Sequence, residues 1–139
     1  MAFWLLKTEP TAYSYADLER DGRAVWDGIR NPLALKNLRA MRRGDRAYIY
    51  HTGDEKQIVG SAEVTCDAYA DPQQPKDTKL AVIDLAPHER LPRPVALAEI
   101  KARREFADLE LVRMSRLSVM PVSDAHWKVL RQIAATNPK

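Results

Sequence analysis

The chain has 139 residues, of which 45% are hydrophobic, and its 22 basic and 19 acidic residues give a formal charge of +3. A chain of this length can bury the core of one domain without disulfides or a structural metal. The small positive excess argues against a densely basic DNA-binding surface, although it permits contact with nucleic acid. We therefore expect a single domain over residues 1–139, with a monomer as its default state.

Reactive and metal-binding side chains are few and scattered. Cys66 is the only cysteine, so no internal disulfide can form, and a lone thiol fits a reducing compartment. The three histidines lie far apart and lack the spacing that places two metal ligands on one helix face. No nucleophile elbow, P-loop or dinucleotide-binding glycine pattern is present. We expect no metal, no cofactor and no catalytic group.

The lengths of the apolar segments bear on whether the protein is secreted or inserted in a membrane. The N-terminal apolar stretch is too short for a signal peptide, and no other stretch approaches membrane-spanning length. We therefore expect a cytoplasmic protein that does not bind a membrane.

The first third of the chain predicts one strand and two helices. Residues 3–7 form an apolar, aromatic run, which is typical of a buried strand. A capping-box pattern that starts at Ser14 predicts a helix over residues 15–20. Asn31-Pro32 predicts the start of a second helix, which should end near Gly44, because asparagine caps free amides and proline fits the first helical position.

The middle of the chain predicts a hairpin and a further strand. Residues 46–52 and 58–66 are rich in β-forming residues and are joined by a polar turn. Gly60 inside the second of these runs indicates a bulge or a close backbone approach. The polar, proline-bearing stretch 71–77 predicts an exposed loop before a strand over residues 80–85.

The last third predicts a helix over residues 95–102, a strand-like run over 118–122 and a terminal helix. Ser123 can cap that helix, and Trp127 lies on its packed face. Five or six strands with helices between and after them argue for an α+β fold whose sheet curls into a small barrel.

Four segments carry a specific pattern: WLLKTEP at 4–10, WDGIRN at 26–31, IVGSAEV at 58–64 and SRLSVMPV at 115–122. Together they resemble the EVE domain family, with a match over nearly the whole chain. The resemblance implies a PUA-like curled β-barrel flanked by helices and related to the YTH domains that bind methylated adenine in RNA. It also implies DNA or RNA with a modified base, particularly modified cytosine in DNA, as the partner.

Two features set this chain apart within the family. Thr8 stands where the family often has serine, which keeps the hydroxyl and adds a methyl group. The basic N-terminal extension of the eukaryotic members is missing from this sequence, so we expect a bacterial source.

Trp26 is the candidate residue for stacking on the bound base. Stacking of a base on an aromatic side chain contributes roughly 1–3 kcal/mol, and the resemblance to the cage tryptophan of YTH domains favours this role. The alternative is a core tryptophan, which is what we expect of Trp4 and Trp127.

Six further residues are candidates for the base pocket: Thr8, Glu9, Asn31, His51, Arg116 and Ser118. Glu9 could accept a hydrogen bond from a base amine, or it could face water in a loop. Asn31 could read a base edge, although its simplest role is to cap the following helix. His51 could line the pocket or lie half-exposed at a strand end, whereas Arg116 and Ser118 should project together from an extended segment.

Five basic residues are candidates for contact with phosphates: Lys7, Arg30, Lys36, Arg39 and Arg43. The last three share one stripe of the second predicted helix. The alternative for that stripe is a solvated helix face without a ligand.

We therefore expect a non-catalytic module that holds one flipped-out base, whose flipping costs a few kcal/mol. Two other functions could use the same pocket. One is an enzyme, or enzyme subunit, of nucleic-acid modification with His51 and Glu9 as acid and base. The other is a sensor of a free nucleotide or another small metabolite.

Overall fold

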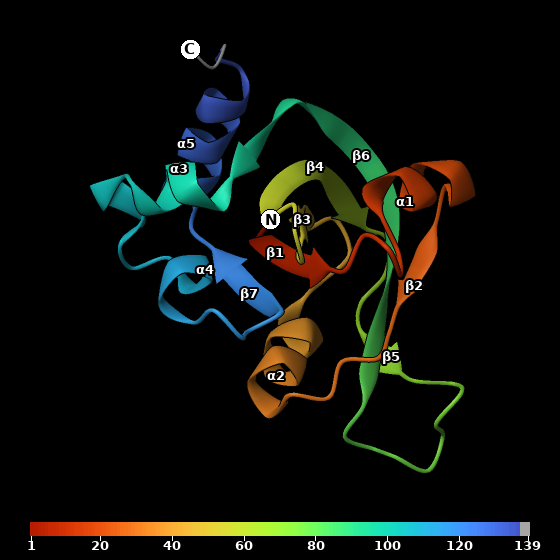
Figure 1. The fold of residues 1–139 in the computed structure, drawn as a ribbon. Helices are drawn as coiled ribbons and strands as arrows, with labels where there is room; N and C mark the ends of the chain where they lie inside the picture. The colour runs from red at the N-terminus through yellow and green to blue at the C-terminus, as the bar shows by residue number, and fades with distance from the viewer. Residues whose placement is uncertain (137–139) are drawn as a thin grey trace.

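The computed structural model describes residues 1–136, so residues 137–139 of the predicted domain lie outside it, and it shows a curled mixed sheet surrounded by helices (Figure 1). The strands are β1 (Phe3–Thr8), β2 (Ala24–Trp26), β3 (Arg46–His51), β4 (Gln57–Val64), β5 (Tyr69–Ala70), β6 (Ala81–Ala96) and β7 (Val119–Val122). The helices are α1 (Tyr15–Asp21), α2 (Pro32–Ala40), α3 (Leu97–Lys101), the 3-10 turn η1 (Arg104–Phe106), α4 (Glu110–Arg113) and α5 (Asp124–Ala134).

The order of strands in the sheet is β2-β6-β4-β3-β1-β7, with β5 paired to β6 outside this path. β1 runs parallel to β3, and the other pairs are antiparallel. α2 packs against both β7, at one edge, and β6, next to the other edge. Only a sheet that curls back on itself allows one helix to contact both places, so the predicted α+β, PUA-like barrel is confirmed.

The core lies inside the curl, where β1, β3 and β4 bury most of their side chains. Trp127 on α5 stacks on Tyr48, with ring centroids 3.7 Å apart, and on Phe3 at 4.4 Å. Trp4 is 7% exposed and donates from Nε1 to Oδ2 of Asp45 at 2.9 Å. The prediction that Trp4 and Trp127 are core residues is confirmed.

The helix starts follow the predicted caps. The Ser14 side chain accepts from the Asp17 amide at the start of α1, with the reciprocal bond of a capping box. Asn31 caps α2, and Ser123 caps α5. These ends form as predicted because each cap needs only hydrogen bonds within about three residues.

The close approach predicted at Gly60 is also confirmed. A Cβ atom at this position would lie 2.5 Å from Cζ of Tyr15. The Tyr15 ring is 1% exposed, and its hydroxyl donates to the Ser61 carbonyl at 2.8 Å. Glycine therefore allows the first helix to seat this ring against the sheet.

Two element ends differ from the predictions. α2 ends at Ala40 and not near Gly44, because Met41 is extended and the Arg42 amide donates to the Asp45 carboxylate at 3.0 Å. The predicted helix over 95–102 starts two residues late.

The reason for the late start is that β6 continues through the proline-bearing stretch to Ala96, where Val95 still pairs with Ile58. The register of β6 against β4 shifts on both sides of Gly60. Irregular pairing of this kind accommodates prolines, which cannot donate to a neighbouring strand.

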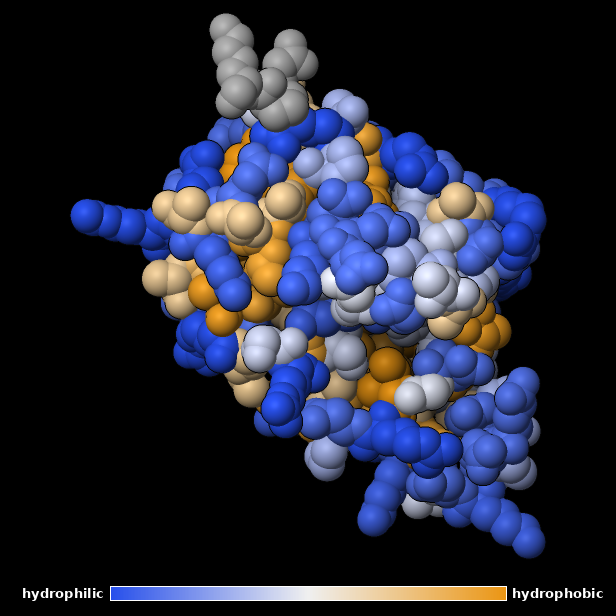
Figure 2. All heavy atoms as spheres, viewed as in Figure 1, coloured by the Kyte–Doolittle hydropathy of each residue, from blue (hydrophilic) through white to orange (hydrophobic). Residues whose placement is uncertain are grey.

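The surface seen in Figure 2 is largely hydrophilic, with apolar atoms visible in hollows between polar side chains. Over residues 1–136, no helix has the length and apolar character needed to cross a membrane. Nor do three or more His, Cys, Asp or Glu side chains of this range gather into a possible metal site.

Candidate functional site

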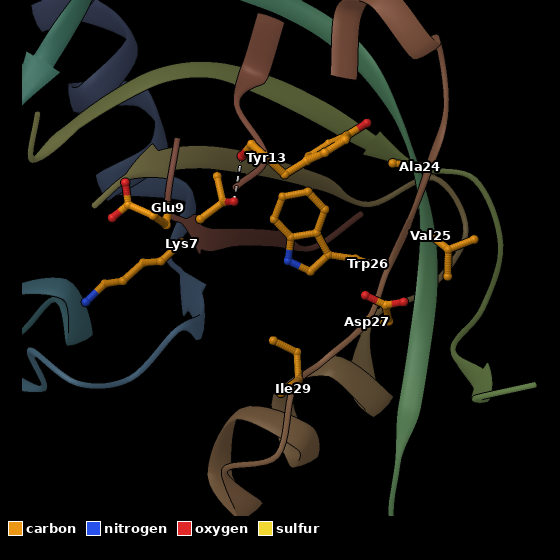
Figure 3. A pocket seen from close by; sticks show the side chains of 9 residues that line it. Lys7, Glu9, Tyr13, Ala24, Val25, Trp26, Asp27 and Ile29 are labelled. Carbon is orange, nitrogen blue, oxygen red and sulfur yellow. Dashed lines mark hydrogen bonds between the residues drawn. The ribbon is translucent and has the colours of Figure 1, made fainter. Parts of the chain in front are cut away.

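A pocket of about 360 Å³ opens between the end of β1 and strand β2. Its lining residues come from these strands and the loops that follow them: Lys7, Thr8, Glu9, Tyr13, Ala24, Val25, Trp26, Asp27 and Ile29. Figure 3 shows the Trp26 indole in the middle of this group, with Lys7 and Asp27 on opposite sides of it. The volume lies within the usual range for small-ligand sites, roughly 300–1,000 Å³.

Trp26 ends the short strand β2 and is held by pairing with Ile83 of β6. Its side chain is 8% exposed and belongs to the core cluster, yet it also lines the pocket. Within residues 1–136, its indole N–H has no hydrogen-bond acceptor, and that nitrogen is not fully buried. The two roles considered for Trp26, core residue and pocket wall, are therefore compatible in the fold.

Tyr13 forms a second aromatic wall that the sequence did not reveal. Its ring meets Trp26 edge to face, with centroids 6.1 Å apart and planes at 80°. Its hydroxyl donates to Asp21 at 2.9 Å. Burial, together with this hydrogen bond, raises the pKa of Tyr13 to about 12, so its hydroxyl stays neutral at physiological pH.

Thr8 and Glu9 both line the pocket, and each also forms hydrogen bonds with neighbouring loops. The Thr8 hydroxyl donates to the Tyr13 carbonyl at 2.7 Å (Figure 3). The Glu9 carboxylate accepts from the Thr11 hydroxyl at 3.2 Å and from the Thr52 hydroxyl at 3.3 Å. Glu9 thus joins the loop after β1 to the end of β3.

Lys7 lies at the edge of the pocket and connects it to the segment before β7. Its Nζ donates to the Ser115 carbonyl at 2.8 Å, and its amide donates to the Ser118 carbonyl at 2.9 Å. Burial lowers the pKa of the Lys7 ammonium below its usual value. Ser118 itself is not among the residues that line the pocket.

Asn31 and Arg116 lie together in a neighbouring hollow of about 380 Å³. The Asn31 carboxamide oxygen accepts from the amides of Leu33 and Ala34, each at 3.0 Å, so the residue acts as the helix cap. Arg113 shares this hollow, and both guanidinium groups are exposed and free of ion pairs to other residues in 1–136. The hollow therefore offers two available cations.

His51 is 7% exposed and lies inside the fold, apart from the pocket lining. Its Nε2 lies 3.0 Å from the Tyr15 amide, and its Nδ1 lies 2.9 Å from Oε1 of Glu55. A backbone N–H can only donate, so Nε2 accepts, and Nδ1 carries the proton of the neutral ring. Both nitrogens connect β3 to adjacent segments.

The predicted phosphate-contacting residues separate into different places. Arg30 lines a hollow of about 190 Å³ that adjoins the pocket through Asp27 and Ile29. Lys36 is exposed on α2. Arg39 donates to the Lys79 carbonyl and, like Arg43, lies toward the end of α2 opposite the Asn31 cap.

Asp27 is a further pocket residue that the sequence analysis did not select. Its position directly after Trp26, in the WDGIRN segment, was the available signal. Tyr13 had no comparable signal, because only tertiary packing brings it against Trp26.

The sequence of this chain matches the family model of the EVE domain over residues 2–133. Mouse thymocyte nuclear protein 1 is 27% identical, over 98% of this chain and 75% of its own length. The structure of Rpa0253 from Rhodopseudomonas palustris is 39% identical and superposes with a TM-score of 0.91, over 96% of this chain and 93% of that one.

Human thymocyte nuclear protein 1, solved in complex with DNA that contains 5-methylcytosine, is 25% identical with a TM-score of 0.91, over 99% of this chain and 100% of that one. An ASCH structure from Zymomonas mobilis, at 17% identity and a TM-score of 0.62, shares the fold over 98% of this chain and 96% of that one. Because the family model spans nearly the whole sequence, this chain is a member of the EVE domain family.

Proposed function

We propose that the pocket binds a single modified base, preferentially a modified cytosine in DNA, and that the protein acts as a reader without catalysing a reaction. The observation that carries this proposal is the pocket of about 360 Å³ with Trp26 and Tyr13 as perpendicular aromatic walls. The human relative in complex with DNA that contains 5-methylcytosine supports the choice of base.

The lining of the pocket suits a base removed from its stack. Flipping a base costs a few kcal/mol, and aromatic contact with roughly 1–3 kcal/mol per base offsets much of that cost. Lys7 and the unpartnered indole N–H of Trp26 can donate to base acceptors. The Thr8 hydroxyl donates to the Tyr13 carbonyl, so this hydroxyl is not paired with a general base.

The test is the affinity for matched oligonucleotides that differ at one base: cytosine, 5-methylcytosine, 5-hydroxymethylcytosine and N6-methyladenine. We expect tightest binding to a modified cytosine. Equal affinity for all four would contradict a modified-base reader. The mass of each oligonucleotide should be unchanged after incubation with the protein, and a mass change would instead indicate an enzyme.

The phosphates of the nucleic-acid strand that carries the bound base need cationic partners. The hollow that contains Arg113 and Arg116 offers two. The Lys7 ammonium connects the pocket to this hollow through its hydrogen bond to Ser115. Neither guanidinium is bound to a carboxylate elsewhere in residues 1–136, so a phosphate would meet no competitor. This hollow is a better phosphate site than the distant end of α2.

A salt titration distinguishes the two sites. The double variant Arg113→Gln/Arg116→Gln should flatten the slope of log Kd against log salt by about 1–2, since each phosphate contact contributes roughly 0.7–0.9. The double variant Lys36→Gln/Arg43→Gln removes the same charge from α2 and the turn that follows it, and should leave the slope near that of the wild type. The opposite result would place the phosphates along α2.

A further inference from the structure

Asp27 provides the pocket with an unoccupied anionic acceptor. It directly follows β2, and Gly28 beside it has a φ of +76°, a left-handed conformation that turns the chain toward α2. The Asp27 carboxylate lies beside Trp26, across the indole from Lys7 (Figure 3). No hydrogen bond or ion pair with the rest of residues 1–136 engages this carboxylate.

The other carboxylate of the pocket is in a different state. Glu9 accepts hydrogen bonds from Thr11 and Thr52, with Oε1 and Oε2 respectively. A Cβ on Gly53 would lie 2.8 Å from Oε2 of Glu9, so this oxygen is packed against the loop after β3. Of the two carboxylates, Asp27 is therefore the one that has no hydrogen-bond donor from residues 1–136, whereas Glu9 is exposed but has such donors.

An ionised carboxylate can accept hydrogen bonds but cannot donate one. The pairing edge of cytosine presents an amino donor beside two acceptors, and carboxylates pair with that amino group in nucleic-acid recognition. Thymine presents an oxygen in place of the amino group, which a carboxylate would repel. Donors for the remaining cytosine acceptors, on Lys7 and Trp26, lie in the same pocket.

We infer that Asp27 is a specificity-determining residue, which selects a pyrimidine with an exocyclic amino group by accepting its hydrogen bond and rejects the matching 4-keto base. This inference rests on the proposed function and replaces Glu9 as the predicted acceptor for the amine. The pair 5-methylcytosine and thymine tests it cleanly, because both bases carry the 5-methyl group and differ on the pairing edge.

The experiment measures Kd for two duplexes in which 5-methylcytosine or thymine stands opposite an abasic site, so that neither base has a pairing partner to lose. A third duplex with an abasic site on both strands measures binding without a base. Wild-type protein should favour 5-methylcytosine over thymine by about ten- to a hundredfold, as expected for a hydrogen bond to a charged group. Asp27→Asn, which can also donate to a keto oxygen, should bring the ratio to within about threefold of unity.

Two variants accompany Asp27→Asn. Asp54→Asn makes the same chemical change on the exposed turn after β3 and should keep the wild-type ratio. Glu9→Gln tests the other carboxylate of the pocket, and a ratio that collapses in this variant would assign the amino group to Glu9 instead. Thermal melting of each variant verifies that the fold is intact, and Asp27→Asn should melt close to the wild type because the side chain is exposed and unpaired.

The possible results distinguish a wrong role for Asp27 from a pocket that does not bind a base at all. If wild-type protein binds both bases equally, but more tightly than the fully abasic duplex, the pocket reads a base, and the role of Asp27 is wrong. A ratio that survives in Asp27→Asn, or collapses in Glu9→Gln, also overturns the inference. If none of the duplexes with a base binds more tightly than the fully abasic one, the proposed function itself fails, and the inference falls with it.

Discussion

Trp26→Ala should lower the affinity for an oligonucleotide with the preferred base by about ten- to a hundredfold and also reduce the free energy of unfolding by about 3–5 kcal/mol. The first effect follows from the loss of the aromatic surface that lines the pocket. The second follows from burial, because the side chain is 8% exposed and packs into the core. Binding titrations and urea unfolding measure the two effects separately.

Trp26→Phe separates the two contributions, since phenylalanine fills most of the buried space but removes the indole N–H and part of the stacking surface. We expect a smaller loss of stability and a clear loss of affinity. Trp127→Ala is the matched control, because Trp127 is also 8% exposed but stacks on Tyr48 and Phe3 in the core. It should lower stability while the folded protein binds normally.

The assignment of the pocket would be wrong if folded Trp26→Phe and Trp26→Ala bound oligonucleotides as tightly as the wild type. Measurements well below the melting temperature of each variant ensure that the titrated protein is folded. A loss of affinity in Trp127→Ala equal to that in Trp26→Ala would likewise show that the assay reports stability and not base contact.

Asp45→Ala should destabilise the fold by about 3 kcal/mol, because it removes the acceptor of three donors at once and leaves the buried Trp4 indole N–H unpaired. Asp45 is 5% exposed. It accepts from the Trp4 indole at 2.9 Å and from the amides of Ala2 and Arg42 at 3.0 Å each. Urea unfolding at neutral pH measures the loss, and Asp54→Ala on the exposed turn is a control that should be nearly neutral.

The contribution of Asp45 to the free energy of unfolding should decrease as the pH falls. Burial raises the pKa of the Asp45 carboxyl, but the hydrogen bonds from Ala2, Trp4 and Arg42 lower it more, so the folded-state pKa lies below the ordinary value. The stabilisation is therefore present above the unfolded-state pKa of about 3.9 and is lost as pH falls through the folded-state pKa. Wild type and Asp45→Ala should converge in stability under acid, and an undiminished difference there would contradict this account.

The sequence by itself determined the elements whose formation depends on near neighbours. The caps at Ser14, Asn31 and Ser123 form as predicted because their side chains bond amides within the same turn. The apolar strand at residues 3–7 and the hairpin that follows α2 also form, since alternation and turn chemistry are local properties. The family pattern added Trp26, Thr8 and Glu9, all of which line one pocket.

Only the tertiary structure decided what surrounds those residues. The curl of the sheet brings Tyr13 and Asp27 to the same pocket and leaves His51 inside the fold, held by Tyr15 and Glu55. It also places Arg39, near the end of α2, in a different hollow from Asn31, which caps the start of this helix. Periodicity and capping specify how each segment folds, whereas the packing of distant segments against one another determines which side chains remain free to meet a ligand.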